Sequence, residues 1–356
     1  MTTNHAILSK LKSHLNLNKS RLKVLTGLII GVIGIRDVNL VKLACYQESD
    51  ATDESQYRKL QRFFKLWCFS WEEVAKLTLS KIPKPRQGYV LSMDRTNWKF
   101  GKRHINILTV GIVVGKVSIP LVWTTLAQTT KRGNSNTHQR IALMKKVLKV
   151  LAVEDIYALT MDREFNGYQW LKWLNNKKTT WVLRLRKDTH INGKSAKFYR
   201  STRKDKHAKK KSVFGLPLYF GCKSIKKGRA DFLYIVSNNL TPNDALETYK
   251  KRWSIEVLFG HLKKKGFNFE NTHMSDKKKI DKLMAVLTLA FLFTIGWGIL
   301  LKEQNLLNAH QKRKSTFRLA LDLIQSMFRK PNKHREKIEL FHQWVASDLN
   351  PQIFVV

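Results

Sequence analysis

The sequence predicts an α/β protein in which a central region of strands and helices lies between helical regions at the two ends. The central region begins after the linker Lys81–Gly88, which contains two prolines and a glycine. Apolar runs typical of strands then alternate with amphipathic helical segments. Two of these runs end in an aspartate, and a later helical segment places polar residues on one face. These features indicate a sheet with polar groups gathered near the ends of its strands.

Residues 1 to 82 have the pattern of short helices. Asn39–Ala44 shows apolar helical periodicity, and Ser55–Trp67 is amphipathic. Its apolar face carries Tyr57, Leu60, Phe63, Phe64 and Trp67, and the aromatic side chains among them are more typical of a hydrophobic core than of base stacking. The opposite face is basic and carries Arg58, Lys59, Arg62 and Lys65. No pattern here specifies a helix-turn-helix, so base readout is not assigned.

The sequence of the central region predicts strands and helices in the order β-β-β-α-β-α-β. Gly115-Lys116, between the second and third strands, is a tight-turn signal. The expected strands are Tyr89–Met93, Ile105–Val114, Val117–Leu126, Ile156–Met161 and Thr180–Leu185, and the expected helices are Gln139–Leu151 and Tyr168–Asn175. A further strand is expected at Ala230–Ser237, before a helix that begins at Thr241-Pro242-Asn243-Asp244.

Two aspartates follow buried strands. Asp94 comes directly after Tyr89–Met93, and Asp162 comes directly after Ile156–Met161. A carboxylate at the end of an apolar strand is costly to bury unless a cation or a hydrogen-bond donor satisfies it. Either aspartate alone is equally well explained as a turn residue or a helix N-cap. A pair of them can also supply oxygen ligands to a divalent cation.

The helix after Thr241 carries four polar side chains at offsets 0, 3, 7 and 14, namely Tyr249, Arg252, Glu256 and Lys263. At about 100° per residue these positions fall within an arc of roughly 60°. A Glu beside Lys and Arg on such a face is usually a solvated ion-pair stripe. Combined with two aspartates, however, it completes a carboxylate set suited to two divalent ions in phosphoryl transfer.

These motifs resemble those of bacterial DDE transposases. The resemblance rests on Asp-Arg-Thr-x-Trp from Asp94, Asp-Arg-Glu-Phe from Asp162, and Tyr-x2-Arg-x3-Glu-x6-Lys from Tyr249 to Lys263. The last pattern is the Tyr-Arg-Glu-Lys signature of insertion sequence family four. The resemblance covers roughly residues 88 to 263, and the three motifs occur in order at compatible separations.

The resemblance implies an RNase H-like catalytic core that performs cut-and-paste transposition. Such an enzyme cleaves DNA at transposon ends and transfers the strands to a target. Asp94, Asp162 and Glu256 would be both the catalytic residues and the metal ligands. They would bind two Mg²⁺ ions, for which Mn²⁺ can substitute. The two aspartates would lie side by side, with the Glu256 helix packed across them.

The resemblance also implies DNA contacts for Tyr249, Arg252 and Lys263. Arg252 would hold a phosphate, Lys263 would contact a phosphate as a point charge, and Tyr249 would pack against the terminal backbone. The expected partners are double-stranded DNA with terminal inverted repeats, target DNA, and a second copy of the chain on that DNA. His104 and His261 lie near these motifs and are expected to be structural or phosphate-proximal rather than ligands.

Residues 187 to 230 are strongly basic, and their only acids are Asp188 and Asp205. Such a run can be a solvated loop, and Arg203–Lys211 is expected to be partly disordered. The other interpretation is a β-rich insertion that lies along DNA, as family members carry between the second Asp and the Glu. In some relatives a tryptophan of this insertion stacks beside a flipped base, but this insertion contains no Trp.

Composition supports a nucleic-acid partner independently. The chain has 356 residues, with 66 Lys and Arg against 26 Asp and Glu, which gives a net charge of +40. An enzyme acting on small metabolites gains nothing from this imbalance, whereas Lys and Arg that neutralise phosphates release counterions. Charge alone does not distinguish an enzyme from a nucleoid or ribosomal protein.

One segment, Leu283–Leu301, has 19 residues without a charge, which is long enough to span a membrane. A fully buried core helix is the favoured alternative. The N-terminus lacks a signal-peptide pattern, and the scattered residues Cys45, Cys68 and Cys222 show no zinc-site spacing. We therefore expect a cytoplasmic protein, associated with the nucleoid and not with a membrane.

The expected domains are a helical DNA-binding region at 1–82, a catalytic core at 88–186 and 231–266, a basic β insertion at 187–230, and a helical C-terminal region at 267–356. The main alternative function is a DNA-binding protein derived from a transposase but without catalysis. A membrane protein and a different RNase H-like nuclease are further alternatives. The nuclease would cut DNA without joining the ends.

Overall fold

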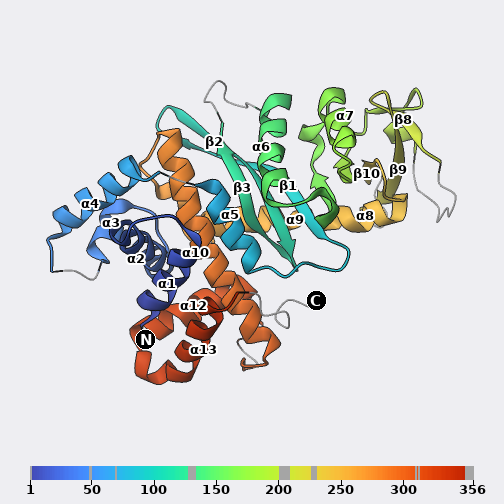
Figure 1. The fold of residues 1–356 in the computed structure, drawn as a ribbon. Helices are drawn as coiled ribbons and strands as arrows, with labels where there is room; N and C mark the ends of the chain where they lie inside the picture. Colours follow the sequence, from blue (N-terminus) through green and yellow to red (C-terminus); the bar gives the residue numbers. More distant parts are fainter. Residues whose placement is uncertain are drawn as a thin grey trace. The chain divides into compact units, whose positions relative to one another are not determined.

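The computed structural model describes residues 2–47, 50–68, 70–126, 134–199, 209–225, 231–308, 311 and 313–348. The chain divides into two units, each built from segments that are distant in sequence (Figure 1). Unit 1 comprises Met1–Pro83, Trp98–Ile105 and Leu258–Val356, and unit 2 comprises Lys84–Asn97 and Asn106–Val257. The two terminal regions, which the sequence predicted separately, thus belong to one unit.

The described residues contain an eight-stranded mixed sheet in the order β3-β2-β1-β4-β5-β10-β9-β8. β1 pairs with β4 and β4 with β5 in parallel, whereas β2 and β3, and β5, β10, β9 and β8, pair antiparallel. The strands are β1 (Tyr89–Phe100), β2 (Arg103–Val114), β3 (Val117–Thr125), β4 (Ile156–Met161), β5 (Trp181–Arg184), β8 (Lys211–Val213), β9 (Leu216–Ser224) and β10 (Phe232–Ser237). A separate pair consists of β6 (His190–Ile191) and β7 (Lys194–Ser195).

The strand and hairpin pattern read from the central region is confirmed in most places. Gly115 has φ +56°, and Val114 pairs with Val117 across the two-residue turn, as a tight hairpin of this kind requires. β1 differs, because it was expected to end at Met93 and instead runs to Phe100. Its partner on one side, β4, ends opposite Met93, while β2 on the other side continues, and this longer neighbour keeps the strand extended.

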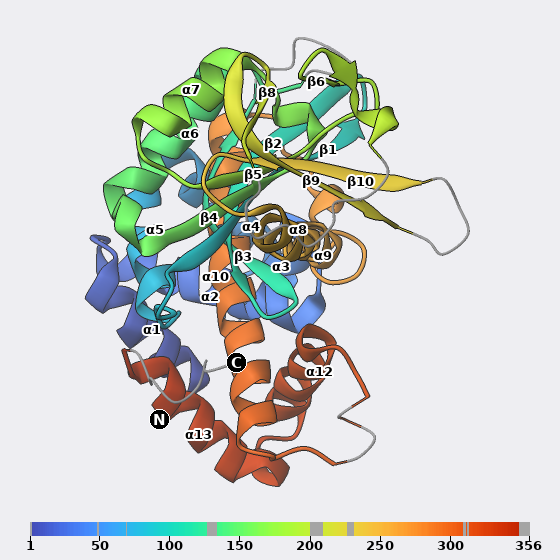
Figure 2. The ribbon, with the colours of Figure 1, turned by 90° about the vertical axis from the view of Figure 1, so that its right-hand side faces the viewer.

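Helices connect the strands of unit 2, and α6 and α7 lie side by side (Figure 2). The helices are α6 (Thr137–Val150), α7 (Tyr168–Asn176), α8 (Pro242–Lys250) and α9 (Trp253–Leu262). The end of α9 belongs to unit 1. Short 3₁₀ helices occur at Val153–Asp155, Arg163–Phe165 and Ala196–Phe198. A capping box between Asn136 and Gln139 fixes the start of α6. α8 packs against β5, β9 and β10.

The basic region after Arg186 is partly β, as expected, and β6 and β7 in it form a two-stranded sheet of their own. β9 and β8 extend the main sheet through β10. The expectation of disorder at Arg203–Lys211 falls mostly on residues 203–208, which lie outside the described residues.

Unit 1 is mainly helical and is built around α10 (Lys277–Glu303), which contacts α2, α4, α5, α12 and α13. The other helices are α1 (Thr3–His14), α2 (Lys19–Ile35), α3 (Leu40–Cys45), α4 (Asp53–Leu66), α5 (Trp71–Ser80), α12 (Thr316–Arg329) and α13 (Arg335–Ala346), with 3₁₀ helices at Phe269–Asn271 and Pro331–His334. Gly296 and Gly298 let neighbours approach α10 closely, since a Cβ on Gly298 would lie 2.6 Å from the carbonyl oxygen of Thr316.

Among the described residues, α10 is the one helix long and apolar enough to cross a membrane. Of its most apolar window, 94% is buried inside the protein. This is the packing of a core helix, which passes the same test of length and composition. The favoured interpretation of Leu283–Leu301 therefore agrees with the burial seen in unit 1.

Candidate functional site

The two aspartates of the sequence motifs follow paired residues of neighbouring parallel strands. Met93 of β1 is the register partner of Met161 of β4, so Asp94 and Asp162 come next on adjacent strands. Asp94 lies within β1 and Asp162 lies between β4 and a 3₁₀ helix. Thr160 ties the strands together further, because its hydroxyl donates to the carbonyl oxygen of Leu91 at 3.0 Å. The sheet therefore places both carboxylates in one neighbourhood.

The segment with Tyr249, Arg252, Glu256 and Lys263 is not one continuous helix, which corrects the expectation from spacing. α8 ends at Lys250 and α9 begins at Trp253. The backbone N–H of Arg252 donates to the carbonyl of Tyr249 three residues earlier, not four. A tight turn of this kind interrupts the α-helical register. Tyr249 thus lies in α8, Arg252 in the turn and Glu256 in α9.

Arg252 links two of the three carboxylates. Its Nη1 lies 3.2 Å from Asp94 Oδ2, and its Nη2 donates to Glu256 Oε1. The Arg252 side chain is 8% exposed, whereas that of Glu256 is 35% exposed. Asp94 and Glu256 together hold the buried guanidinium, and the Glu256 carboxylate remains accessible to solvent.

Asp162 has two neighbours of its own. The Tyr249 hydroxyl donates to Asp162 Oδ1 at 3.3 Å, and Arg184 Nη1 lies 4.0 Å from the same oxygen. Unit 2 therefore gathers Asp94, Asp162 and Glu256 around Tyr249 and Arg252, as the sequence motifs led us to expect.

Burial dominates the electrostatics of this cluster. It raises the pKa of Asp94 to about 7, although the Arg95 backbone N–H and the Arg252 guanidinium act in the opposite direction. Burial also raises the pKa of the Tyr249 phenol, so the phenol stays protonated and can donate. Burial opposes the charge on Arg252, but Tyr249, Glu256 and the aspartates together raise its pKa. Asp94 is thus an incompletely compensated carboxylate.

A chain of hydroxyls seats α9 on the sheet, and the sequence motifs did not include it. Ser118 Oγ of β3 lies 2.7 Å from Ser92 Oγ of β1 and 2.6 Å from Ser254 Oγ of α9. All three side chains are buried. The signal was available, since Ser92 and Ser118 interrupt otherwise apolar runs, but the contact with Ser254 depends on tertiary structure.

Two further arginines fix the loop that follows Asp162. Arg140, of α6, is 5% exposed and donates to the carbonyl oxygens of Ser135, Glu164 and Asn166. Arg95 Nη2 lies 3.3 Å from Glu164 Oε2. Both arginines hold the loop after β4, and so the backbone that carries Asp162.

A basic hollow of about 800 Å³ lies next to Asp162 in unit 2. Its lining includes five cationic side chains, namely Arg163, Arg184, Arg186, Lys187 and Lys197. Asp188 and Asp231 contribute the acids, and Phe232 and Tyr234 supply aromatic surface. This composition suits a polyanion with apolar faces, such as a nucleic-acid strand.

Lys263 and His261 belong to unit 1. Lys263 Nζ lies 2.9 Å from Glu270 Oε1 and 5.7 Å from the centre of the Trp98 ring. His261 stacks on Phe317 with the ring centres 4.3 Å apart, and burial lowers its pKa to about 4. His261 is accordingly a neutral packing residue, which agrees with the structural role expected for it.

A family model described as the transposase DDE domain matches residues 78–293, which is more than half of the chain. The chain belongs to the transposase DDE domain family. Membership implies a DNA-cleaving enzyme with DNA as its substrate. No curated protein matches the sequence.

Transposases of this family generally use divalent metal ions, and the donor chemistry of the cluster fits them. Carboxylate oxygens are the ligands that such ions prefer, and buried Asp94 lacks full charge compensation. In the described residues, however, no three His, Cys, Asp or Glu side chains are grouped closely enough to hold one ion. Arg252 lies between Asp94 and Glu256 and bonds to both.

Proposed function

We propose that this transposase cleaves DNA at the ends of an insertion sequence and transfers the strands to a target, by the cut-and-paste route of the Tyr-Arg-Glu-Lys family. The observation that carries the proposal is that Arg252 bonds to Asp94 and Glu256 while Tyr249, three residues earlier, bonds to Asp162. The strand order β3-β2-β1-β4-β5, with α9 linked to β3 through Ser254 and Ser118, supports an RNase H-like core.

In this proposal Asp94, Asp162 and Glu256 hold divalent ions, with Mg²⁺ as the physiological choice and Mn²⁺ as a substitute. Bound ions would supply Lewis-acid activation of a water or 3′-hydroxyl oxygen and would stabilise charge on the scissile phosphate. The chain's own residues orient that site. Tyr249 fixes Asp162 by a hydrogen bond, and the hydroxyls of Ser118 and Ser254 fix α9.

Arg252 exchanges partners in the proposed cycle. Its guanidinium bonds to Asp94 and Glu256 in the free protein and would turn one edge to a DNA phosphate when the strand enters. Arg163, Arg184 and Arg186 in the neighbouring hollow would contact phosphates further along the strand. Lys263 would take the same role at the terminal DNA after leaving Glu270.

The ion pairs of Arg252 also support a second candidate, a DNA-binding protein without catalysis. They engage two of the carboxylates that catalysis needs. In either case we propose that the chain acts on double-stranded DNA in the cytoplasm. Cut-and-paste transposition additionally needs two copies of the chain to pair the two ends.

The test is a combined cleavage and joining assay on DNA that carries the ends of the encoding element, with Mg²⁺ and a supercoiled target. Wild type should cut and join, whereas Glu256→Gln should bind the ends with unchanged affinity and cut neither strand. Cleavage by Glu256→Gln at the wild-type rate would remove Glu256 from the site. Binding without cutting by both proteins would support the second candidate, and cutting without joining would indicate a nuclease.

A further inference from the structure

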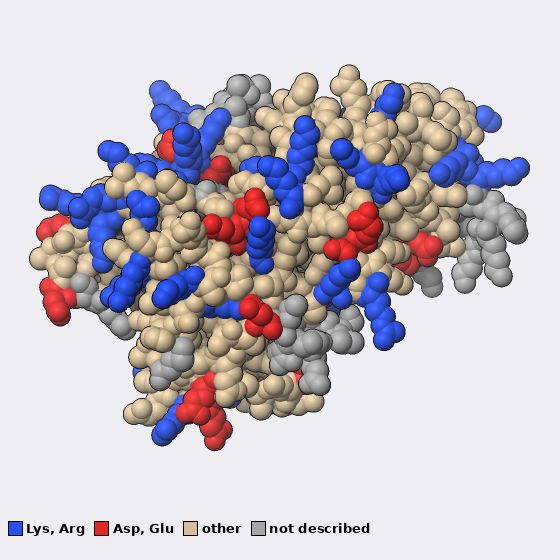
Figure 3. Space-filling model, in the orientation of Figure 1, with Lys and Arg blue, Asp and Glu red and all other residues tan. Residues whose placement is uncertain are grey.

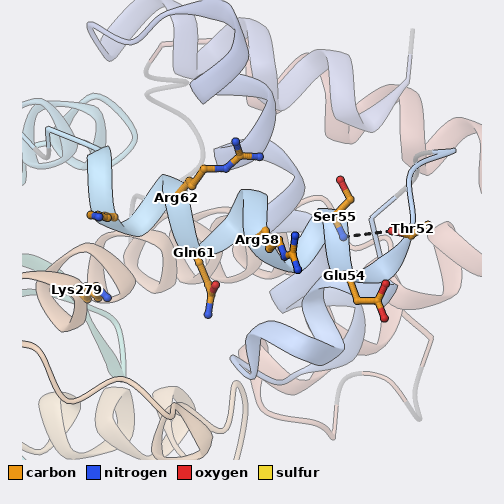
Figure 4. A pocket seen from close by; sticks show the side chains of 8 residues that line it. Thr52, Glu54, Ser55, Arg58, Gln61, Arg62 and Lys279 are labelled. Atoms are coloured by element: carbon orange, nitrogen blue, oxygen red, sulfur yellow. Dashed lines mark hydrogen bonds between the residues drawn. The ribbon is translucent and has the colours of Figure 1, made fainter.

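A second basic hollow, of about 760 Å³, lies entirely within unit 1 and is made of residues that take no part in the carboxylate cluster. Figure 4 shows it along α4, with Lys279 contributed by α10. All of its lining side chains are polar or charged, and they are Thr52, Glu54, Ser55, Arg58, Gln61, Arg62, Lys65 and Lys279. Four of these eight residues are cations and only Glu54 is an acid.

The cations form a stripe on the exposed side of α4. Arg58, Arg62 and Lys65 follow one another at steps of four and three residues, which keeps them on one helical face. The other face is fixed in the core through Leu60 and Phe64. In the view of Figure 3, Lys and Arg side chains gather over α4. The three positions span about 10 Å of helix axis, which corresponds to roughly three phosphates along one strand of a duplex.

Among the described residues these cations have no acidic partner, unlike other surface cations of the protein. Lys76 pairs with Glu72, and Lys250 pairs with Glu247. Within the described part of the chain, no ion pair involves Arg58, Arg62, Lys65 or Lys279. Uncompensated positive charge in a concave surface attracts an anionic partner.

The hollow is also pre-formed. Lys282 of α10 donates to the carbonyl oxygens of Phe64 and Lys65 at 2.8 and 3.4 Å, which are carbonyls of the last turn of α4. At the other end Thr52 accepts a hydrogen bond from the backbone N–H of Ser55 and so caps the helix. Because α4 is tied to α10 through Lys282, Lys279 stays beside the stripe, and a ligand meets an ordered surface.

We infer that the exposed face of α4, with Lys279, binds the phosphate backbone of duplex DNA without reading its sequence. The inference rests on the proposed function for the identity of the partner. Duplex DNA is favoured over a lipid surface because the hollow has no apolar side chain to enter a bilayer, and the apolar face of α4 is already buried. The site would add affinity for DNA that does not depend on catalysis.

The test measures binding of a labelled 30-base-pair duplex of arbitrary sequence by fluorescence anisotropy in EDTA, over a range of salt concentrations. Arg58→Ala/Arg62→Ala/Lys65→Ala should bind at least about tenfold more weakly than wild type near 0.1 M salt. It should also lower the slope of log K against log salt by about 2–3, at roughly 0.9 for each phosphate that is no longer neutralised. Alanine is the best helix former, so α4 should persist, and circular dichroism checks this.

The matched control removes the same charge elsewhere on unit 1, by Lys12→Ala/Lys19→Ala/Lys330→Ala, and should change the slope little. Glu54→Gln should have the opposite effect on DNA affinity, because it removes the one acid of the hollow, and we expect it to tighten duplex binding two- to fivefold. A gain in affinity cannot arise from misfolding.

Equal weakening by the stripe and control triples would overturn the inference and leave only non-specific attraction by net charge. Unchanged binding by the stripe triple, with wild type binding normally, would overturn the site but not the proposed function. Absence of duplex binding by wild type would overturn the proposed function itself. If the stripe triple lost the binding of wild type to phosphatidylserine vesicles but still bound the duplex normally, DNA would be overturned as the occupant of the hollow.

Discussion

Arg252 is an internal counter-ion at the residue scale. It is buried and bonds to Asp94 and Glu256, two carboxylates that the proposal assigns to divalent ions. A buried cation and a metal ion compete for the same oxygens, because both are attracted to the same negative charge. The free protein can therefore keep its carboxylates close together without a metal, at the expense of metal affinity.

Arg252→Gln should accordingly separate binding of the metal from catalysis. Removing the guanidinium should raise the affinity for Ca²⁺, a non-catalytic ion, by several-fold in isothermal titration calorimetry. The same variant should cut DNA much more slowly with Mg²⁺, because a phosphate ligand is lost. Ca²⁺ affinity equal to or below that of wild type would show that Arg252 does not occupy the metal position.

Asp94 gives stability a characteristic pH dependence. Its pKa is raised to about 7, so the folded protein holds a proton at pH values where an unfolded aspartate has lost it. The free energy of unfolding without metal should therefore fall as the pH rises from about 4 to about 7, by on the order of 4 kcal/mol. Asp94→Asn should lack this component, which urea denaturation at several pH values can measure. Parallel pH profiles for the two proteins would contradict the shift.

The sequence was sufficient to identify which residues meet, but not how. The strand-end aspartates and the segment from Tyr249 to Glu256 do lie near one another in unit 2, whereas their role as a site stays a prediction. The direct bonding of Arg252 to two carboxylates was not foreseen, because a guanidinium is commonly assigned to a phosphate when only the motif is visible. Its orientation depends on the tight turn between α8 and α9, which local propensity does not encode.

At the element scale, the orientation of α9 depends on the buried hydroxyls of Ser92, Ser118 and Ser254. Ser118 is the central member and contacts both of the others. A buried hydroxyl that loses its partner keeps its full desolvation cost, about 1–3 kcal/mol. Because Glu256 lies on α9, its position depends on the hydrogen bonds that Ser118 makes with Ser92 and Ser254.

Ser118→Ala should reduce the free energy of unfolding by about 1–3 kcal/mol, since Ser92 and Ser254 lose their shared partner. It should also slow DNA cleavage while leaving duplex binding intact, because α9 shifts relative to β1. The exposed Ser212, on β8, provides a matched control whose alanine variant should stay within about 0.5 kcal/mol of wild type. Equal stability and activity of the two variants would remove the hydroxyl chain from the account of the site.

Periodicity was a good guide to single elements and a poor guide to their continuity. The hairpin at Gly115-Lys116 and the helix at Tyr168 follow from local patterns. The extension of β1 to Phe100 depends on β2 as a neighbour, and the break before Trp253 coincides with the burial of Arg252. Both are tertiary effects that override a local pattern.

On the scale of the whole molecule, the net charge of +40 is spread over both units. Unit 2 has a basic hollow beside Asp162, and unit 1 has one along α4. Composition correctly indicated a nucleic-acid partner, because family membership implies a DNA substrate. It could not locate the surfaces, since a hollow forms only when helices such as α4 and α10 pack together.

The interleaving of the chain was likewise beyond the sequence. Residues 98–105 and the segment from Leu258 onward group with the N-terminal helices in unit 1. The apolar segment Leu283–Leu301, which suggested a membrane span, is instead buried as the central helix of that unit. Burial by partners from distant parts of the chain cannot be read from the segment itself.

The central claim is that Asp162 and its neighbours hold the ions that cut DNA, and it is tested most directly by changing the ligand atom. Wild type, Asp162→Asn and Asp162→Cys should be compared for end cleavage in Mg²⁺ and in Mn²⁺, with duplex binding in EDTA as the folding control. All three should bind DNA equally. We expect both variants to be inactive in Mg²⁺ and Asp162→Cys to regain cleavage in Mn²⁺, the ion more tolerant of sulfur. Cleavage by Asp162→Asn in Mg²⁺ at the wild-type rate would contradict the claim.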